Sequence, residues 1–214
     1  MIIVNRSERR EEKWKFPFVM YMPQGKGEKL PLVIQLHGAG ERGNGESDLS
    51  LVEVHGFSEV VQDMECECIL VMPQCPSDSF WVAKIESIIE FIEQIKEEYN
   101  IDDTRIYLTG YSMGGYGTWY TAMAKPDLFA AIAPVCGGGM PWNASVLNMP
   151  VWAFHGENDT VVTPVNSEEM VDKLKALGND VKYTKVEGIA HAVWDYAYNT
   201  QLLDWLLRNK KEER

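Results

Sequence analysis

A serine lies at the centre of a short glycine-rich motif in the middle of the chain. Residues 110–114 read Gly-Tyr-Ser-Met-Gly, so a glycine stands two positions before and two positions after Ser112. The motif follows an apolar, strand-like run and precedes a helix-like one. Glycines there allow a strained strand-to-helix turn without Cβ clashes, and the helix N-terminus adds partial positive charge beside the serine. This context predicts a nucleophile; an idle serine in a glycine-rich turn is the alternative.

A serine hydroxyl is a poor nucleophile until a base takes its proton, so a histidine and a carboxylate are expected further along the chain. The histidines after Ser112 are His155 and His191. His191 and Asp159 each follow a strand-like run. Because the carboxyl ends of parallel strands meet at one edge of an open sheet, we expect Ser112, Asp159 and His191 to form a catalytic triad.

Other interpretations remain open for two members of this triad. Glu157 and Asp195 are the rivals of Asp159 as the carboxylate, and Asp159 could instead cap the following helix. His191 could be a solvated loop histidine.

Acyl transfer also requires two backbone N–H groups that stabilise the developing oxyanion. The residue after the nucleophile, Met113, supplies the first by position. The segment 37–43 reads His-Gly-Ala-Gly-Glu-Arg-Gly, and its small residues let the backbone approach a ligand. We assign the second oxyanion-hole donor to Ala39.

Three polar residues of the same segment are assigned supporting roles. His37 is interpreted as a structural histidine that braces the loop, with a catalytic role as the alternative. Glu41 and Arg42 are expected to tie the loop down by a salt bridge, with substrate contact by Arg42 at the pocket rim as the alternative.

The rest of the chain alternates between strand-like and helix-like patterns. Apolar runs rich in β-branched residues predict strands at 16–22, 30–36, 68–72, 105–109, 130–135, 151–154 and 181–186. Helical spacing of apolar residues predicts helices at 82–99, 113–124, 164–177 and 194–208. Strands that alternate with helices predict an α/β fold with a doubly wound, mostly parallel sheet and helices on both faces. Without an internal repeat or linker, residues 1–214 are expected to form one domain.

Composition narrows the class of partner. The chain has 32 acidic and 20 basic residues, a formal charge of −12, which disfavours nucleic acid and anionic membranes. No apolar stretch approaches the ~20 residues of a membrane span, and the first residues lack a secretory pattern, so a cytoplasmic protein is expected.

The four cysteines, Cys66, Cys68, Cys75 and Cys136, do not have zinc-site spacing. We expect free thiols, no metal and no cofactor.

Taken together, these motifs resemble the small α/β-hydrolase esterases, which include phospholipase/carboxylesterase-type enzymes and related predicted peptidases and feruloyl or acetyl esterases. The matching pieces are residues 37–43, 73–75 with Trp81, 110–115, 155–159, and 188–191 with Trp194 and Asp195. The resemblance runs from about Leu30 to the C-terminus. It implies the α/β-hydrolase fold and the hydrolysis of short-chain acyl or hydroxycinnamoyl esters.

The segment 136–150, where many such hydrolases insert a lid, is too short to hold a cap domain. We therefore expect an open site with pocket walls formed by Trp81, Trp142 and Trp194, although core packing is the alternative for each. An open site favours a serine carboxylesterase that removes acetyl or aromatic acyl groups from a small molecule or plant carbohydrate. The alternatives are an acyl-protein thioesterase or lysophospholipase-like hydrolase, and a non-catalytic binding module. The sequence specifies no oligomeric state.

Overall fold

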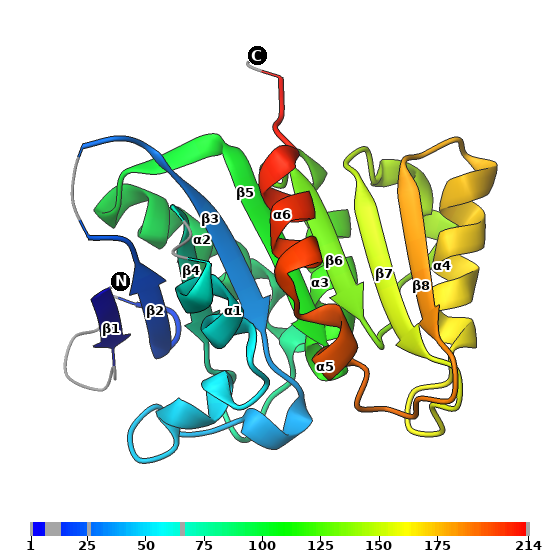
Figure 1. The fold of residues 1–214 in the computed structure, drawn as a ribbon, viewed down its shortest axis with the longest axis horizontal. Helices are drawn as coiled ribbons and strands as arrows, with labels where there is room; N and C mark the ends of the chain where they lie inside the picture. Colours follow the sequence, from blue (N-terminus) through cyan, green and yellow to red (C-terminus); the bar gives the residue numbers. More distant parts are fainter. Residues whose placement is uncertain (1, 7–13, 25–26, 65–66, 213–214) are drawn as a thin grey trace.

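The computed structural model describes residues 2–6, 14–24, 27–64 and 67–212. Within them an eight-stranded sheet has the strand order β1-β2-β4-β3-β5-β6-β7-β8, with helices on both faces (Figure 1). The strands β3 to β8 are parallel to one another. At one edge, β2 runs antiparallel to β4, and β1 runs antiparallel to β2. The predicted doubly wound, mostly parallel sheet is therefore confirmed.

The predicted strands are all present, with ends shifted by a few residues. Their bounds are Phe18–Met22 (β2), Leu30–Leu36 (β3), Ile69–Pro73 (β4), Ile101–Tyr111 (β5), Ala131–Val135 (β6), Val151–Gly156 (β7) and Val181–Val186 (β8). An eighth strand, Ile2–Arg6 (β1), was not predicted. It pairs along its whole length with β2 at the sheet edge, so its conformation depends on a partner strand that short-range patterning does not reveal.

The helices form two layers. One face of the sheet carries Ile85–Glu98 (α2), Met113–Ala124 (α3) and Val165–Ala176 (α4), and the other carries Phe57–Asp63 (α1), Trp194–Ala197 (α5) and Thr200–Arg208 (α6) (Figure 1). Short 3₁₀ helices lie at Ala39–Glu41 (η1), Leu49–Glu53 (η2), Trp81–Ala83 (η3), Pro126–Leu128 (η4) and Pro141–Val146 (η5). The helices predicted at 82–99, 113–124 and 164–177 are present, while α1 was not predicted.

The C-terminal helix expected at 194–208 is two helices rather than one. Asn199 has an extended backbone and caps α6, because its side chain accepts a hydrogen bond from the Leu202 amide at 3.0 Å. An asparagine side chain competes for backbone amides and so favours a helix start over a helix interior. The prediction of one continuous helix is therefore wrong.

The sheet separates two apolar cores, and side-chain alternation along its strands assigns residues to each. On β3, Leu32 and Ile34 are fully buried with α2, α3 and α4, whereas Val33 is fully buried on the face of α1 and α6. The helix α2 packs with its isoleucine-rich face inward, as its spacing predicted. Burial on both faces explains why the central strands are apolar runs without polar alternation.

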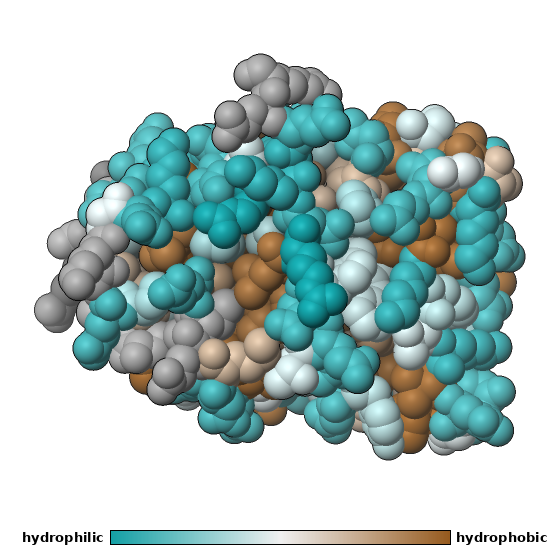
Figure 2. All heavy atoms as spheres, turned by 45° about the horizontal axis from the view of Figure 1, so that its top comes forward, coloured by the Kyte–Doolittle hydropathy of each residue, from teal (hydrophilic) through white to brown (hydrophobic). Residues whose placement is uncertain are grey.

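Both ends of the sheet are visible in the structure, and they differ. The parallel strands point downward in Figure 1, so the loops that follow β3, β5, β7 and β8 gather at the lower edge. The segment 136–150, all of it described, contains only η5 and no cap domain. The opposite end, turned forward in Figure 2, is mostly hydrophilic with smaller apolar areas between. No described helix has the length and apolar character that crossing a membrane requires.

Gly114 allows α3 to lie directly on the end of β3, and its replacement should destabilise the fold. A Cβ at Gly114 would lie 2.0 Å from the Leu36 carbonyl oxygen, a backbone atom that cannot rotate away. We expect Gly114→Ala to lower the free energy of unfolding by about 1–3 kcal/mol or more, as overpacked sites do, in urea titrations.

The matched control is Gly40→Ala, because a Cβ at Gly40 meets nothing within 4 Å. This variant should lie within about 0.5 kcal/mol of wild type. Equal stabilities for the two variants would contradict the close contact between α3 and β3.

Candidate active site

Ser112 occupies a strained turn between β5 and α3. Its backbone has φ 54° and ψ −118°, a conformation that non-glycine residues rarely adopt, and its amide donates to the Val135 carbonyl at 2.9 Å. The flanking glycines are required sterically, since a Cβ at Gly110 would lie 2.5 Å from the Gly114 carbonyl oxygen. The turn has the features of a nucleophile elbow, which presents the serine hydroxyl above the sheet.

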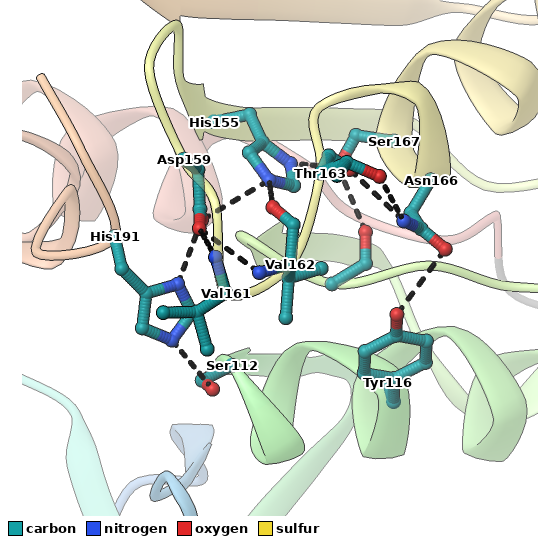
Figure 3. Close-up of polar contacts among 11 residues, drawn as sticks. Ser112, Tyr116, His155, Asp159, Val161, Val162, Thr163, Asn166, Ser167 and His191 are labelled. Atoms are coloured by element: carbon teal, nitrogen blue, oxygen red, sulfur yellow. Dashed lines mark hydrogen bonds and ion pairs between the residues drawn. The ribbon is translucent and has the colours of Figure 1, made fainter.

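The structure brings Ser112, His191 and Asp159 into one hydrogen-bonded series (Figure 3). His191 Nε2 lies 2.9 Å from Ser112 Oγ, and His191 Nδ1 lies 2.6 Å from Asp159 Oδ2. The three residues come from the loops after β5, β7 and β8, as expected for the carboxyl edge of a parallel sheet. Glu157 and Asp195 lie elsewhere, since both are exposed and Glu157 accepts the Gly188 amide at 2.9 Å.

Asp159 is buried but well supplied with donors. Its Oδ1 accepts from the amides of Val161 and Val162, both at 2.9 Å, and its Oδ2 faces His191. Burial by itself would raise the Asp159 pKa, but the hydrogen bonds from His191 and from the two amides outweigh it, so the pKa lies below its usual value. Asp159 is therefore a carboxylate at neutral pH.

A second histidine, His155, braces the loop that holds Asp159. Its Nε2 lies 2.8 Å from the Val162 carbonyl and 3.4 Å from Asp159 Oδ2, and its Nδ1 lies 2.7 Å from Ser167 Oγ (Figure 3). Because the carbonyl only accepts, Nε2 carries the proton of the neutral ring. Burial lowers the pKa of His155 and keeps it neutral. Sequence reasoning gave this residue no role. Its position at the end of β7, four residues before Asp159, was the available signal.

The two predicted oxyanion-hole residues line one apolar groove. Ala39 begins η1 and Met113 begins α3, and both border a groove of about 340 Å³. The Met113 amide belongs to the first turn of α3, where amides have no intrahelical partner. The other lining residues are Phe80, Val82, Tyr116 and Tyr120.

Sequence reasoning did not identify the groove residues other than Ala39 and Met113. Tyr116 and Tyr120 are four residues apart on α3, so they lie on one face of the helix, in line with Ser112 four residues earlier. That spacing was a usable signal. The Tyr116 hydroxyl donates to Asn166 Oδ1 at 3.2 Å, which ties the groove to α4 (Figure 3). Phe80 and Val82, on either side of Trp81, reach the groove only through the local turn at η3.

The three tryptophans considered as pocket walls lie in different surroundings, and for Trp81 the structure agrees with the alternative of core packing. Trp81 is fully buried and donates from Nε1 to the His37 carbonyl at 2.9 Å, because η3 turns its ring into the core. Trp142 is 79% exposed on η5 and does not line the groove, because η5 carries it to the surface. Trp194 does lie beside the site, with its ring centroid 5.6 Å from that of His191.

His37 braces the segment 37–43, as interpreted; this segment is named the oxyanion loop after the donor role assigned to Ala39. Its Nε2 accepts from the Cys75 amide at 2.9 Å, so the neutral ring carries its proton on Nδ1, which lies 2.6 Å from the Gly38 carbonyl. Burial lowers the pKa of His37 to about 4. The ring is therefore neutral at pH 7 and connects the loops after β3 and β4.

The other polar residues of this loop have different partners from those expected. Arg42 donates to the carbonyls of Ala39 at 2.9 Å and Ser79 at 3.3 Å, and its guanidinium lies 4.9 Å from the centre of the Phe80 ring. Glu41 pairs with His55 rather than with Arg42 among the described residues. Arg42 thus fixes the loop through carbonyls and packs against a groove residue.

A buried glutamine, quoted in the motif 73–75 but given no role from the sequence, completes this anchor. Gln74 donates from Nε2 to the carbonyls of Glu41 at 3.1 Å and Asp48 at 2.9 Å, and its Oε1 accepts from the Gly45 amide at 2.9 Å. Its place directly after a buried strand was the available signal. Gln74 holds the segment between η1 and η2 against the end of β4.

Cys75 and Cys136 are free thiols, as expected, and both are buried, as is Cys68; Cys66 lies outside the described residues. Cys136 follows β6 with φ 41°. Its sulfur lies within 4.8 Å of a carboxylate oxygen of Asp159 and of a ring nitrogen of His191. Burial raises the Cys136 pKa, so it is a neutral thiol. A larger cavity of about 910 Å³ lies at the amino ends of β5 and β7 and contains none of the residues described above.

The neutral state of His37 predicts a specific dependence of stability on pH. The unfolded chain binds a proton at His37 near pH 6.5, whereas the folded chain binds it only near pH 4, so stability falls as pH falls through this window. At 1.36 kcal/mol per pKa unit, lowering the pH from 6.5 to 5 removes about 2 kcal/mol.

His37→Gln, which keeps an acceptor for the Cys75 amide, isolates this contribution. Urea unfolding at pH 7 and pH 5 should show the stability difference between wild type and variant shrinking by about 2 kcal/mol at the lower pH. An unchanged difference would mean that His37 titrates alike in the folded and unfolded states.

Several known proteins are similar to this chain in sequence. Residues 72–200 match the Phospholipase/Carboxylesterase family. A bifunctional acetylxylan esterase/xylanase of Neocallimastix patriciarum is 34% identical over 149 residues, which is 67% of this chain and 21% of that protein. Poly(3-hydroxyalkanoate) depolymerase C of Paucimonas lemoignei is 23% identical over 235 residues, 86% of this chain and 55% of that protein. The chain thus spans about a fifth of the first relative and about half of the second.

Solved structures give the same fold. The crystal structure of a thermostable esterase superposes with a TM-score of 0.86 and 33% identity, and the match covers 98% of this chain and 63% of that one. The feruloyl esterase module from Clostridium thermocellum, at 18% identity and a TM-score of 0.71 over 100% of this chain and 90% of that one, shares the fold. By its sequence and its fold, the chain belongs to the phospholipase/carboxylesterase family of α/β-hydrolases.

Proposed function

We propose that the chain is a serine carboxylesterase that hydrolyses short-chain acyl or aromatic acyl esters. The observation that carries the proposal is the series Ser112–His191–Asp159, with contacts of 2.9 and 2.6 Å, beside the groove bordered by Ala39 and Met113. The partial identity to an acetylxylan esterase/xylanase agrees with this reaction class.

The first half of the reaction acylates Ser112. His191 Nε2 accepts the hydroxyl proton while Oγ attacks the acyl carbon, and the C=O π pair moves onto oxygen. Asp159 holds the proton on Nδ1 and stabilises the imidazolium through the 2.6 Å contact. When the tetrahedral intermediate collapses, the bond to the alcohol oxygen breaks and His191 returns the proton to that oxygen.

The second half releases the acid by the same route. A water gives its proton to His191 and attacks the acyl carbon, and the bond to Ser112 Oγ then breaks as the proton passes back to the serine. In both halves the amides of Ala39 and Met113 donate to the oxyanion, which forms only in the transition state and intermediate. Those donors therefore contribute to kcat.

The groove favours an acyl group of limited length. Because both assigned oxyanion donors border it, the groove receives the acyl side of the ester, and its remaining lining is largely apolar and aromatic. The alcohol side faces solvent, since the segment 136–150 forms no cap over the site. A bulky alcohol such as a carbohydrate chain can therefore be accommodated.

Ser112→Ala should abolish turnover in a folded protein. Loss of the nucleophile is expected to lower kcat on p-nitrophenyl acetate by about 10⁴- to 10⁶-fold. Circular dichroism checks the fold, and Ser145→Ala, at an exposed serine of η5, is the matched control that keeps the wild-type rate. A folded Ser112→Ala variant with a near-normal rate would refute the proposal.

The size of the groove predicts the preferred acyl group. Among p-nitrophenyl esters from acetate to palmitate, together with methyl ferulate, we expect kcat/KM to be highest for short or aromatic acyl groups. Val82→Trp, at a lining position, should fill the groove and lower kcat/KM on methyl ferulate by about tenfold or more, with a smaller effect on acetate.

The alternative activities give different results in the same panel. Fastest turnover of palmitate would favour a lysophospholipase-like enzyme, and turnover of an acyl thioester but not of its matched oxyester would favour a thioesterase. Equal effects of Val82→Trp on acetate and ferulate would show that the groove does not hold the acyl group.

A further inference from the structure

His55, in the turn between η2 and α1, contacts residues next to all three parts of the site. Its Nε2 lies 3.5 Å from Glu41 Oε1, on the 3₁₀ helix that begins with Ala39. Its ring centroid lies 4.7 Å from that of Tyr111, the residue before Ser112. The same ring lies 4.5 Å from that of Trp194, which follows the His191 loop. His55 is thus a common neighbour of three segments: the loop that contains Ala39, the turn at Ser112, and the loop that contains His191.

The contact with Glu41 joins a largely buried carboxylate to the His55 imidazole. Burial by itself would raise the Glu41 pKa, but contacts with His55 and Tyr111 outweigh it and lower the pKa. Among the described residues, His37 and His55 are the basic groups within 4.0 Å of Glu41. His37 donates to the Gly38 carbonyl and is neutral at pH 7. His55 is therefore the partner of Glu41.

The contact with Trp194 extends this link to the catalytic base. The Trp194 ring lies 5.1 Å from Tyr111 and 5.6 Å from His191, where it meets the imidazole at 87°. The Trp194 indole thus contacts His55, Tyr111 and His191. A continuous series of contacts runs from Glu41 through His55 and Trp194 to His191.

From this arrangement we infer that His55 is a positioning residue of the esterase site, which fixes the oxyanion loop relative to the His191 loop across Ser112. The inference rests on the proposed function. The Ala39 amide and the His191 ring must reach the same reacting centre, and misplacement by about 1 Å at such a centre lowers rates by about 100-fold. Because both groups act mainly in the transition state, His55 supports kcat rather than substrate binding.

The test compares three variants on p-nitrophenyl acetate. His55→Ala removes the ring and should lower kcat by about 10- to 100-fold while KM stays within about threefold. His55→Phe keeps an aromatic ring for Tyr111 and Trp194 but loses the Glu41 contact, and Glu41→Gln removes the charge from the other side. If the two groups act through one contact, the His55→Phe, Glu41→Gln double variant should have the kcat of the slower single variant, not the product of both losses.

The control is Val54→Ala, at the adjacent residue, whose side chain is 54% exposed and lines no part of the site. It should keep the wild-type kcat and KM. Phenylboronic acid, which bonds to a serine oxygen as a tetrahedral mimic of the transition state, provides a second readout. Its Kd should rise for His55→Ala by a factor similar to the loss in kcat, which a purely structural role with intact site geometry would not produce.

The outcomes separate this inference from the proposed function. If wild type and Val54→Ala both fail to hydrolyse p-nitrophenyl esters, the proposed function fails. If both are active and folded His55→Ala has a normal kcat, or only its KM changes, the positioning role is wrong while the esterase remains. If His55→Ala does not fold, the His55→Phe and Glu41→Gln cycle decides, and additive losses in kcat would overturn the inference.

Discussion

The close packing of α3 on the ends of β3 and β6 is the constraint on which the site depends. The first turn of this helix lies so near the strands that a Cβ at Gly114 would be 2.0 Å from the Leu36 carbonyl oxygen, and one at Gly115 would be 2.4 Å from that of Val135. Only glycine fits there, so Ser112 is held at φ 54°. The same contact sets the start of the helix at Met113, next to the oxyanion loop.

Around this fixed turn, charge is confined to a few positions. Asp159 is an ionised carboxylate within the protein, where hydrogen bonds from His191 and two amides offset its burial. His155 and His37 are the opposite case, because burial lowers the pKa of each and keeps each ring neutral. As neutral rings both brace loops, and His155 does so without placing a positive charge beside Asp159 that would compete with His191. One fold thus uses two imidazoles for structure, while the proposed function assigns acid–base chemistry to a third, His191, in a different environment.

The open carboxyl edge of the sheet accounts for the rest of the proposed specificity. In the proposed reaction the groove beside Met113 receives the acyl group, and segment 136–150, which forms no cap, leaves the alcohol in solvent. The oxyanion loop at this edge is anchored by side chains outside the triad, namely Gln74, which donates to the Glu41 carbonyl, and His55, which contacts both Glu41 and Trp194. Loops carry the functional groups, while buried polar contacts give them fixed positions.

The sequence by itself determined the parts that depend on local pattern. Spacing of apolar residues predicts the parallel strands and α2 to α4, and the glycines around Ser112, with Asp159 and His191 after later strands, predict where three functional side chains meet. Tertiary structure alone decided what depends on packing between distant segments. The pairing of β1, the burial of Trp81 and the position of His55 belong to this class. A strand at a sheet edge depends on a partner that local pattern does not identify. An aromatic or histidine side chain fits a core, a pocket wall or a loop contact equally well until its neighbours are known.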